Sequence, residues 1–231
     1  VDALGAENVI GVAMPSKYNS KDSLDDAIKL SDNLGITLKT IEIEKLVDDF
    51  RETLTNSLNE DLGQITDENI QSRVRGNILM GLSNQTGAMV VSTGNKSEMA
   101  VGYSTLYGDL AGGFALIKDL YKTKVYELSN YVNSISDVIP KNIITKEPSA
   151  ELRPNQFDSD SLPDYEVLDK ILNLYIEEDS SSEKIIASGV DPDLVFDVLE
   201  KVDRNEYKRK QVAPGVKLTQ KAFGKDRRMP I

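Results

Sequence analysis

Apolar residues recur along the first part of the chain in a pattern that alternates between strands and helices. Residues 8–14 form a nearly unbroken apolar run, which is typical of a strand buried on both faces of a parallel sheet. Apolar residues at helical spacing follow up to Leu34, and Gly35 interrupts this spacing, which predicts the end of a helix. The pattern then predicts a strand over residues 36–43 and a helix over residues 44–59.

The alternation continues through the middle of the chain. Thr66 is expected to cap a long helix, and the short apolar strand that follows, residues 88–92, leads directly into Thr93-Gly94-Asn95. Strands that alternate with helices favour an α/β fold in which helices cover both faces of a parallel sheet. Because ligands of such folds bind beyond the carboxyl ends of strands, we expect ligand contacts at residues 14–20 and 93–98.

The second part of the chain is predicted to be mainly helical. An amphipathic helix is expected over residues 122–135, and the polar, Pro-containing segment 146–161 is predicted to be a loop or linker. Ser161-Leu162-Pro163-Asp164 resembles a capping box in front of the next helix, and Asp191-Pro192 is expected to begin another.

These patterns divide the chain into an α/β core, residues 1–145, which we expect to bind a nucleotide, and a helical C-terminal region with a basic tail, residues 146–231. The net charge of -11 disfavours a nucleic-acid partner. From residue 201 onwards, however, ten basic side chains stand against three acidic ones. This tail is either a solvated surface or a segment that meets a phosphorylated ligand.

The composition excludes several kinds of chemistry. None of the 231 residues is Cys or His, so the chain offers no thiol nucleophile, disulfide, imidazole base or His/Cys metal site. A bound metal needs oxygen ligands here, which favours magnesium or calcium. The lack of Cys agrees with a reducing cytosol and equally with a secreted protein that needs no disulfides. We expect a cytoplasmic protein. No apolar run approaches the roughly 20 residues that span a bilayer, so no membrane partner is expected.

Residues of the predicted ligand-binding segment 93–98 are candidates for nucleotide or metal binding. Gly94 follows a strand and has no Cβ, which lets a nucleotide approach the backbone closely. Glu98 lies in the first turn of the next helix, which Asn95 or Ser97 is expected to cap. Its carboxylate either binds a hard cation that bridges phosphate oxygens or only complements the helix dipole.

Two further groups of side chains suit an anionic ligand. Asn69, Arg73 and Asn77 share one helix face, which is either solvated or able to recognise a carboxylate or phosphate, while Arg75 points away from it. Lys122 lies near a helix N-terminus, where a cation gains nothing from the dipole, so it indicates either an anionic ligand or a surface lysine.

Four longer strings carry a resemblance to a known family. They are NIQSRVRG (69–76), TGNKSEMAVGYSTLYGD (93–109), TKEPSAELRP (145–154) and FGKDRRMP (223–230). Together they resemble the synthetase domain of glutamine-dependent NAD synthetase. This domain belongs to the ATP pyrophosphatases, whose sheet is of the adenine-nucleotide α-hydrolase type.

The resemblance implies a two-step reaction on nicotinic acid adenine dinucleotide, or deamido-NAD. The nicotinate carboxylate attacks the α-phosphate of ATP and releases pyrophosphate, and ammonia then displaces AMP to give NAD. The resemblance implies Mg²⁺ as cofactor and ATP as co-substrate. Such a reaction needs alignment and charge neutralisation more than a protein nucleophile, and a chain without Cys and His can perform it.

The resemblance also implies roles for individual residues, none of them as nucleophile or base. ATP contacts are expected from Thr93, Lys122 and Ser149. Contacts with deamido-NAD are expected from Asn69, Arg73, Glu98, Tyr103, Ser104, Thr105, Leu106 and Lys225. Glu98 is also the expected metal ligand. Smaller, ammonia-only relatives usually carry Lys at the position of Leu106.

Two parts of the family pattern do not occur in these residues. The phosphate-binding loop Ser-Gly-Gly-x-Asp-Ser is expected just before residue 1, and a glutaminase domain with a Cys nucleophile is expected elsewhere in a longer chain. We therefore expect residues 1–231 to have little or no activity alone. The resemblance also implies a homodimer or larger assembly. Two alternatives stay open: another amide-forming ATP pyrophosphatase, and a non-catalytic scaffold that binds a nucleotide or mediates assembly.

Overall fold

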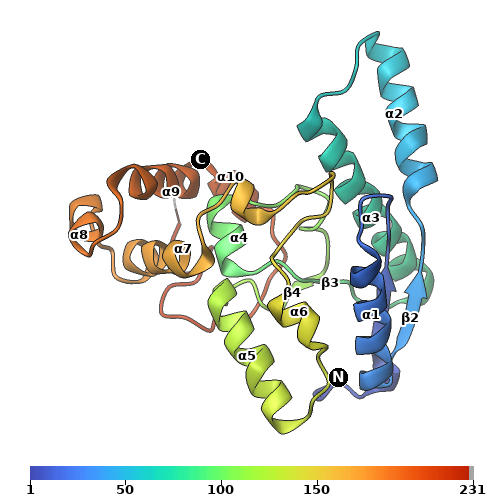
Figure 1. The fold of residues 1–231 in the computed structure, drawn as a ribbon, viewed down its shortest axis with the longest axis horizontal. Helices are drawn as coiled ribbons and strands as arrows, with labels where there is room; N and C mark the ends of the chain where they lie inside the picture. The colour runs from blue at the N-terminus through green and yellow to red at the C-terminus, as the bar shows by residue number, and fades with distance from the viewer. Residues whose placement is uncertain (229–231) are drawn as a thin grey trace. The chain divides into compact units, whose positions relative to one another are not determined.

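The computed structural model describes residues 1–228, which form two compact units. The first unit contains residues 1–75 and 126–160, and the second contains, among the described residues, 76–125 and 161–228. The chain passes between the units three times: inside α3 (Gln64–Thr86), inside α5 (Lys122–Ile135) and between residues 160 and 161. Figure 1 shows both helices. No helix in the described part of the chain is long and apolar enough to cross a membrane. The functional division at residues 145 and 146 stays a prediction.

The first unit is built around one pair of parallel strands. β1 pairs with β2 in the register Ile10↔Thr37 to Ala13↔Thr40, and the connecting helix α1 packs on both strands. Gly35 ends α1 in the left-handed conformation, with φ 66°, as the sequence predicts. Besides the parts of α3 and α5, the elements are η1 (Ala6–Asn8), β1 (Ile10–Ala13), α1 (Lys21–Leu34), β2 (Thr37–Thr40), α2 (Glu44–Leu58), α6 (Lys141–Thr145) and η2 (Asp158–Asp160).

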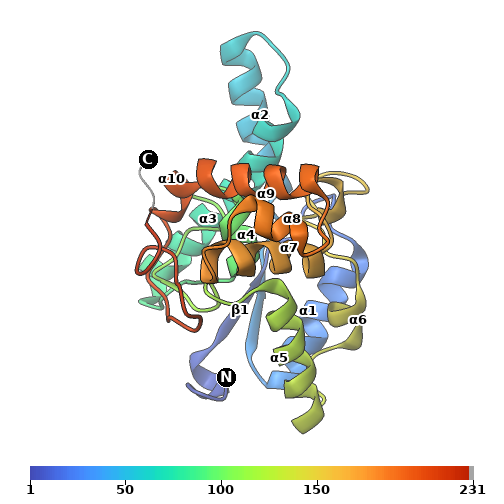
Figure 2. The ribbon, with the colours of Figure 1, turned by 90° about the vertical axis from the view of Figure 1, so that its left-hand side faces the viewer.

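The second unit joins a short parallel strand pair to a helical cluster. Its elements are β3 (Val91–Ser92), α4 (Lys96–Val101), β4 (Phe114–Ala115), α7 (Tyr165–Leu172), the π-helical turn η3 (Asn173–Glu177), α8 (Ser182–Ala187), α9 (Pro192–Arg204) and α10 (Glu206–Arg209). α9 packs on α4, α7 and α8, and Figure 2 shows it lying over the last two. The fully buried side chains of this unit include Leu168, Ile171, Ile176, Ile185, Val195 and Val198.

The strand pattern differs from the predicted single sheet. The described residues contain two separate two-stranded sheets, β1 with β2 and β3 with β4, both parallel as expected. The expectation that residues 8–14 are buried on both faces is wrong for these residues. Ile10 is 45% exposed because β1 has only one neighbouring strand in the described part of the chain.

Helix boundaries were predicted well and capping residues less well. α5 and α9 begin as expected, and the Asp191 carboxylate accepts from the backbone N–H groups of Asp193 and Leu194. Thr66 is not a cap, because α3 already begins at Gln64. No capping box forms in front of α7, whose N-cap Asp164 makes no side-chain bond to the helix backbone.

A buried lysine joins α4 to three later segments of the second unit. Lys96 is fully buried, and its ammonium lies 2.9 Å from a carboxylate oxygen of Asp119 and also contacts the Glu177 carboxylate. It donates further hydrogen bonds to Thr219 Oγ1 at 2.5 Å and to the Lys221 carbonyl at 2.8 Å. A buried charge is tolerated only when it is paired and hydrogen-bonded, and these contacts meet both conditions.

Replacing this lysine is expected to destabilise the protein strongly. Lys96→Met keeps most of the stem but leaves Asp119 and Glu177 buried without their cation, so we expect a loss of about 3–5 kcal/mol in the free energy of unfolding, measured by urea denaturation. Lys17→Met is the control, because Lys17 pairs with Glu44 at the surface and is expected to cost at most about 1 kcal/mol. Equal losses in the two variants would contradict this account of Lys96.

Candidate functional site

The turn after β3 is shaped by a reciprocal cap. Asn95 Oδ1 accepts from the Glu98 N–H at 3.1 Å, and Glu98 Oε2 accepts from the Asn95 N–H at 3.2 Å. Of the two caps that the sequence left open, the structure therefore selects Asn95. A Cβ added at Gly94 would lie 2.5 Å from the Met99 methyl group, so a larger residue there would require the Met99 side chain to move.

Glu98 also pairs with the predicted ATP contact Lys122. Glu98 Oε1 lies 3.2 Å from the Lys122 ammonium, which is 5.3 Å from the centre of the Tyr165 ring. Lys122 is the first residue of α5, as expected. Its unfavourable position relative to the helix dipole is thus offset by a carboxylate and an aromatic face. Both side chains remain 20% exposed, so a ligand can reach the pair.

The buried carboxylate of Asp169, on α7, connects the start of α5 to α4. Asp169 accepts from the backbone N–H of Thr123 at 2.9 Å and from its hydroxyl at 2.8 Å, and it also accepts from the Ser97 hydroxyl. The Ser97 oxygen in turn accepts from the Lys122 N–H at 2.9 Å. Burial raises the pKa of Asp169, although these hydrogen bonds oppose the rise. Lys122 and Glu98 are thereby placed by the backbone and not only by their own contact.

The residues present fit a magnesium ion only if the substrate supplies most of its ligands. Among residues 1–228 there is no cluster of three or more acidic side chains that could hold a metal. Glu98 is the one carboxylate among the predicted site residues. Magnesium commonly binds through one or two carboxylates together with substrate phosphates and water, and this donor set matches that pattern.

The loop from Tyr103 to Leu106 is held by a lysine that the sequence analysis missed. Lys208, on α10, donates to the carbonyls of Gly102 at 2.7 Å and Ser104 at 2.8 Å, and burial lowers its pKa. Thr105 N–H donates to Asp109 Oδ1 at 2.6 Å. The buried Ser104 Oγ has no hydrogen-bond partner in the described part of the chain. The sequence showed Lys208 only as one of many basic tail residues.

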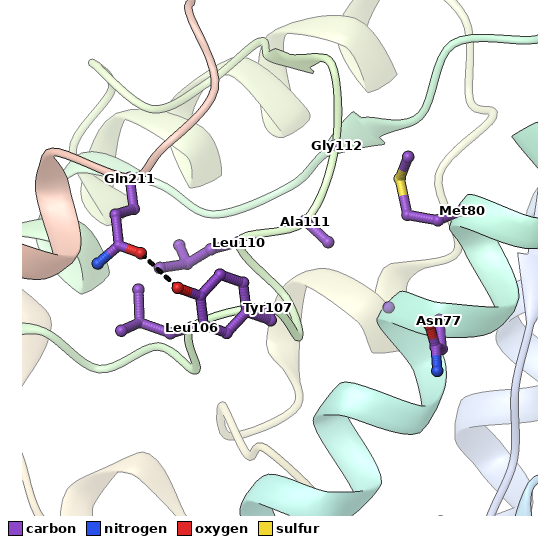
Figure 3. A pocket seen from close by; sticks show the side chains of 9 residues that line it. Asn77, Met80, Leu106, Tyr107, Leu110, Ala111, Gly112 and Gln211 are labelled. Atoms are coloured by element: carbon purple, nitrogen blue, oxygen red, sulfur yellow. Dashed lines mark hydrogen bonds between the residues drawn. The ribbon is translucent and has the colours of Figure 1, made fainter.

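A cavity of about 280 Å³ lies between this loop and α3 in the second unit (Figure 3). Leu106, a predicted substrate contact, lines it together with Asn77 of α3. The Tyr107 hydroxyl donates to Gln211 Oε1 at 2.9 Å, which links the loop to the tail. The lining residues are Gly76, Asn77, Met80, Leu106, Tyr107, Leu110, Ala111, Gly112 and Gln211.

The predicted site residues are divided between the two units. Asn69, Arg73 and Ser149 belong to the first unit, in which Arg73 is exposed on α3. The Ser149 hydroxyl donates to the Gln156 carbonyl at 2.5 Å and accepts from the Glu151 N–H at 3.0 Å, so it shapes its own loop. The members in the second unit are Thr93, Glu98, Tyr103, Ser104, Thr105, Leu106, Lys122 and Lys225.

In the first unit, the predicted ligand segment after β1 is tied to α3. Arg75 donates to the Met14 carbonyl at 3.1 Å and to Asn19 Oδ1 at 3.2 Å, and burial lowers its pKa. Glu151 accepts from Lys146, Ser23 and Asn19, each at 2.7 Å. These contacts fix the shape of residues 14–20 and of the loop that contains Ser149.

The basic tail is in large part a structural element. The Arg209 guanidinium is buried and pairs with Glu206 at 3.0 Å, while Lys208 and Lys221 make internal bonds. Lys225 differs from them, because its ammonium is exposed and makes no hydrogen bond or ion pair within residues 1–228. Burial lowers the pKa of Lys118, and the nearby charge of Lys225 lowers it further. The tail is therefore neither entirely a solvated surface nor entirely a segment that meets a phosphorylated ligand.

Known proteins resemble this chain both in fold and in sequence. The structural matches have the adenine-nucleotide α-hydrolase-like fold. The family model described as NAD synthase matches residues 1–212, and the chain belongs to this family.

Individual relatives extend this result. A glutamine-dependent NAD(+) synthetase of Thermotoga maritima is 55% identical over the whole chain, which spans 40% of that relative's length. A structure of glutamine-dependent NAD+ synthetase from Acinetobacter baumannii in complex with ADP is 48% identical, with a TM-score of 0.62, over 100% of this chain and 41% of that one. The NH3-dependent NAD synthetase of Campylobacter jejuni is 29% identical, with a TM-score of 0.66, over 87% of this chain and 75% of that one.

Two glycines of α3 give a matched test of the cavity wall. A Cβ at Gly76 would lie 2.6 Å from the Tyr107 carbonyl and 3.0 Å from the Gly108 carbonyl, whereas a Cβ at Gly81 meets nothing within 4 Å. We expect Gly76→Ala to lower the free energy of unfolding by about 1–3 kcal/mol and to displace residues 107–108. Gly81→Ala is expected to raise it by about 0.5–1 kcal/mol. Urea denaturation measures the free energy of unfolding of both variants. An unchanged value for Gly76→Ala would disprove the close approach of Gly76 to the carbonyls of residues 107 and 108.

Proposed function

We propose that the chain carries the synthetase reaction of a glutamine-dependent NAD synthetase. ATP adenylates the nicotinate carboxylate of deamido-NAD, and ammonia then replaces AMP to give NAD. The observation that carries this proposal is the 55% identity to such a synthetase over the whole chain, a range that contains the four strings on which the resemblance rests. The chain spans about two fifths of that relative, so the activity belongs to the complete polypeptide.

The contacts of Lys122 and Glu98 support a role at the nucleotide. The attack on the α-phosphate increases negative charge on the phosphate oxygens, and a cation that is already in place lowers the cost of this charge. Lys122 is held by Glu98, by Tyr165 and through its N–H by Ser97, so little reorganisation is needed at the moment of reaction. Thr93, exposed at the end of β3, is the proposed neighbouring contact with ATP, and Ser149 is the third.

The deamido-NAD contacts are proposed on two surfaces. Asn69 and Arg73 offer an amide and a guanidinium from one face of α3, which suits paired hydrogen bonds to a phosphate or carboxylate. Tyr103, Ser104, Thr105 and Leu106 offer a loop that Lys208 fixes from behind. Lys225 adds an exposed cation. A dinucleotide with two phosphates and a carboxylate matches these donors in charge.

Mg²⁺ is the proposed cofactor, held by Glu98 and the phosphates of ATP. When bound, it neutralises phosphate charge and makes pyrophosphate a better leaving group. We further propose that ammonia comes from a glutaminase domain of the complete chain, that the protein assembles as a homodimer or larger oligomer, and that it acts in the cytoplasm.

The proposed reaction is tested with the complete polypeptide that carries residues 1–231. Deamido-NAD, ATP, Mg²⁺ and ammonia are expected to give NAD, AMP and pyrophosphate in equal amounts, measured by chromatography. Omission of ATP is the control. If no NAD forms, the synthetase proposal is wrong. If nicotinic acid mononucleotide is amidated and deamido-NAD is not, the protein is instead another amide-forming member of the class.

Arg73 gives a residue-level test of substrate recognition. Arg73→Ala is expected to raise the KM for deamido-NAD about tenfold or more and to leave the KM for ATP nearly unchanged, because a charged hydrogen bond to the dinucleotide is lost. Steady-state kinetics measure both constants. Arg204→Ala is the matched control, since Arg204 is an exposed arginine of α9 that pairs with Glu200. Equal rises for ATP and deamido-NAD would contradict the role of Arg73.

A further inference from the structure

The buried ammonium of Lys96 lies where α4 meets the C-terminal tail. α4 begins directly after the turn Thr93-Gly94-Asn95, which contains a proposed ATP contact, and Lys96 is the first residue of the helix. The Lys96 N–H donates to the Leu120 carbonyl at 2.7 Å, so both its backbone and its side chain bind the segment that leads into α5. This connection involves only residues of the second unit.

The tail between Leu218 and Lys221 depends on the same cluster for its backbone bonds. It forms no helix or strand, and three of its N–H groups donate to the two carboxylates that neutralise Lys96. Leu218 and Thr219 donate to Asp119 Oδ2 at 2.7 and 2.8 Å, and Lys221 donates to Glu177 Oε2 at 2.7 Å. The bonds from Thr219 and Leu218, together with the Lys96 ammonium, lower the pKa of Asp119, although its burial alone would raise it.

Thr219 connects the tail to the cation most directly. Its Oγ1 lies 2.5 Å from the Lys96 ammonium and 3.0 Å from each Asp119 carboxylate oxygen. The hydroxyl can therefore accept from Lys96 and donate to Asp119 at the same time. An isosteric methyl group at this position can do neither, yet it leaves the ion pairs of Lys96 with Asp119 and Glu177 in place.

Lys225 follows this anchored segment in a tight turn. The Asp226 carboxylate accepts from the Ala222 N–H at 2.9 Å and pairs with Lys217 at 2.7 Å, and Gly224 has φ 78°. The turn starts one residue after Lys221, so the anchor at Lys221 sets where Lys225 stands. An exposed lysine on an irregular tail contributes more to binding when the tail is ordered in advance, because less conformational entropy is lost on binding.

We propose that Lys96, acting through Thr219 and the Asp119 and Glu177 carboxylates, is a positioning residue that orders the tail and holds Lys225 at the deamido-NAD site. This inference rests on the proposed function, because it takes deamido-NAD as the ligand that Lys225 meets. In this arrangement one buried charge cluster joins the tail to α4, the helix that begins directly after the turn Thr93-Gly94-Asn95.

The test uses Thr219→Val and Thr219→Ser in the complete polypeptide, with Thr53→Val as the matched control on the exposed surface of α2. Thr219→Val is expected to weaken deamido-NAD binding about three- to tenfold, as one lost hydrogen bond implies, and to leave ATP binding within about twofold. Thr219→Ser keeps the hydroxyl and is expected to bind like wild type. Calorimetry measures both dissociation constants.

Hydrogen exchange gives a second readout that does not need activity. In Thr219→Val, peptides that cover residues 213–224 are expected to exchange at least about tenfold faster than in wild type, because their N–H bonds to Asp119 and Glu177 open more often. Wild-type exchange and unchanged deamido-NAD affinity in Thr219→Val would overturn the inference, as would equal weakening of ATP and deamido-NAD. A wild-type protein that binds deamido-NAD but makes no NAD would refute only the proposed function.

Discussion

The ammonium of Lys96 is buried, and this one charge constrains much of the second unit. A cation without access to water must be matched by nearby carboxylates and hydrogen-bond acceptors, and here these come from segments far apart in the sequence. Asp119 lies before α5, Glu177 ends the π-helical turn, and Thr219 belongs to the tail. Each must stay in place for the charge to remain compensated, so the cluster fixes the relative positions of α4, η3 and the tail.

The same rule explains how the candidate site is built. Asp169 fixes the start of α5, Arg209 and Glu206 form a buried pair beside α4, and Lys208 supports the loop from Tyr103 to Leu106. Of the groups proposed to meet ligands, Glu98 and Lys122 lie at the accessible ends of these networks, and Lys225 is exposed in the turn after the anchored tail. Buried charges therefore provide a rigid support, and partly exposed charges provide the chemistry.

Features that depend on contacts within a few residues could be predicted from the sequence, and features that depend on distant contacts could not. Gly35, Asn95 and Asp191 act on their own helix ends through contacts within a few residues, so the pattern contained their roles or narrowed them to two candidates. Thr66 was assigned wrongly because several polar residues near it fit a cap equally well. Residues 1–228 form two separate strand pairs and not the predicted single sheet. A run of apolar residues predicts a strand but does not specify which strands pair with it.

By itself the sequence determined the helices, the parallel strands, the chemistry excluded by the lack of Cys and His, and, through four strings, the family. Only the tertiary structure decided which basic and acidic residues are structural. Along the chain Lys96, Lys208 and Arg209 resemble ordinary surface charges. The structure shows that Lys96 and Arg209 are buried and Lys208 is partly buried, each against distant carboxylates or carbonyls. The physical reason is that the cost of burying a charge depends on partners in space, and sequence spacing does not contain those partners.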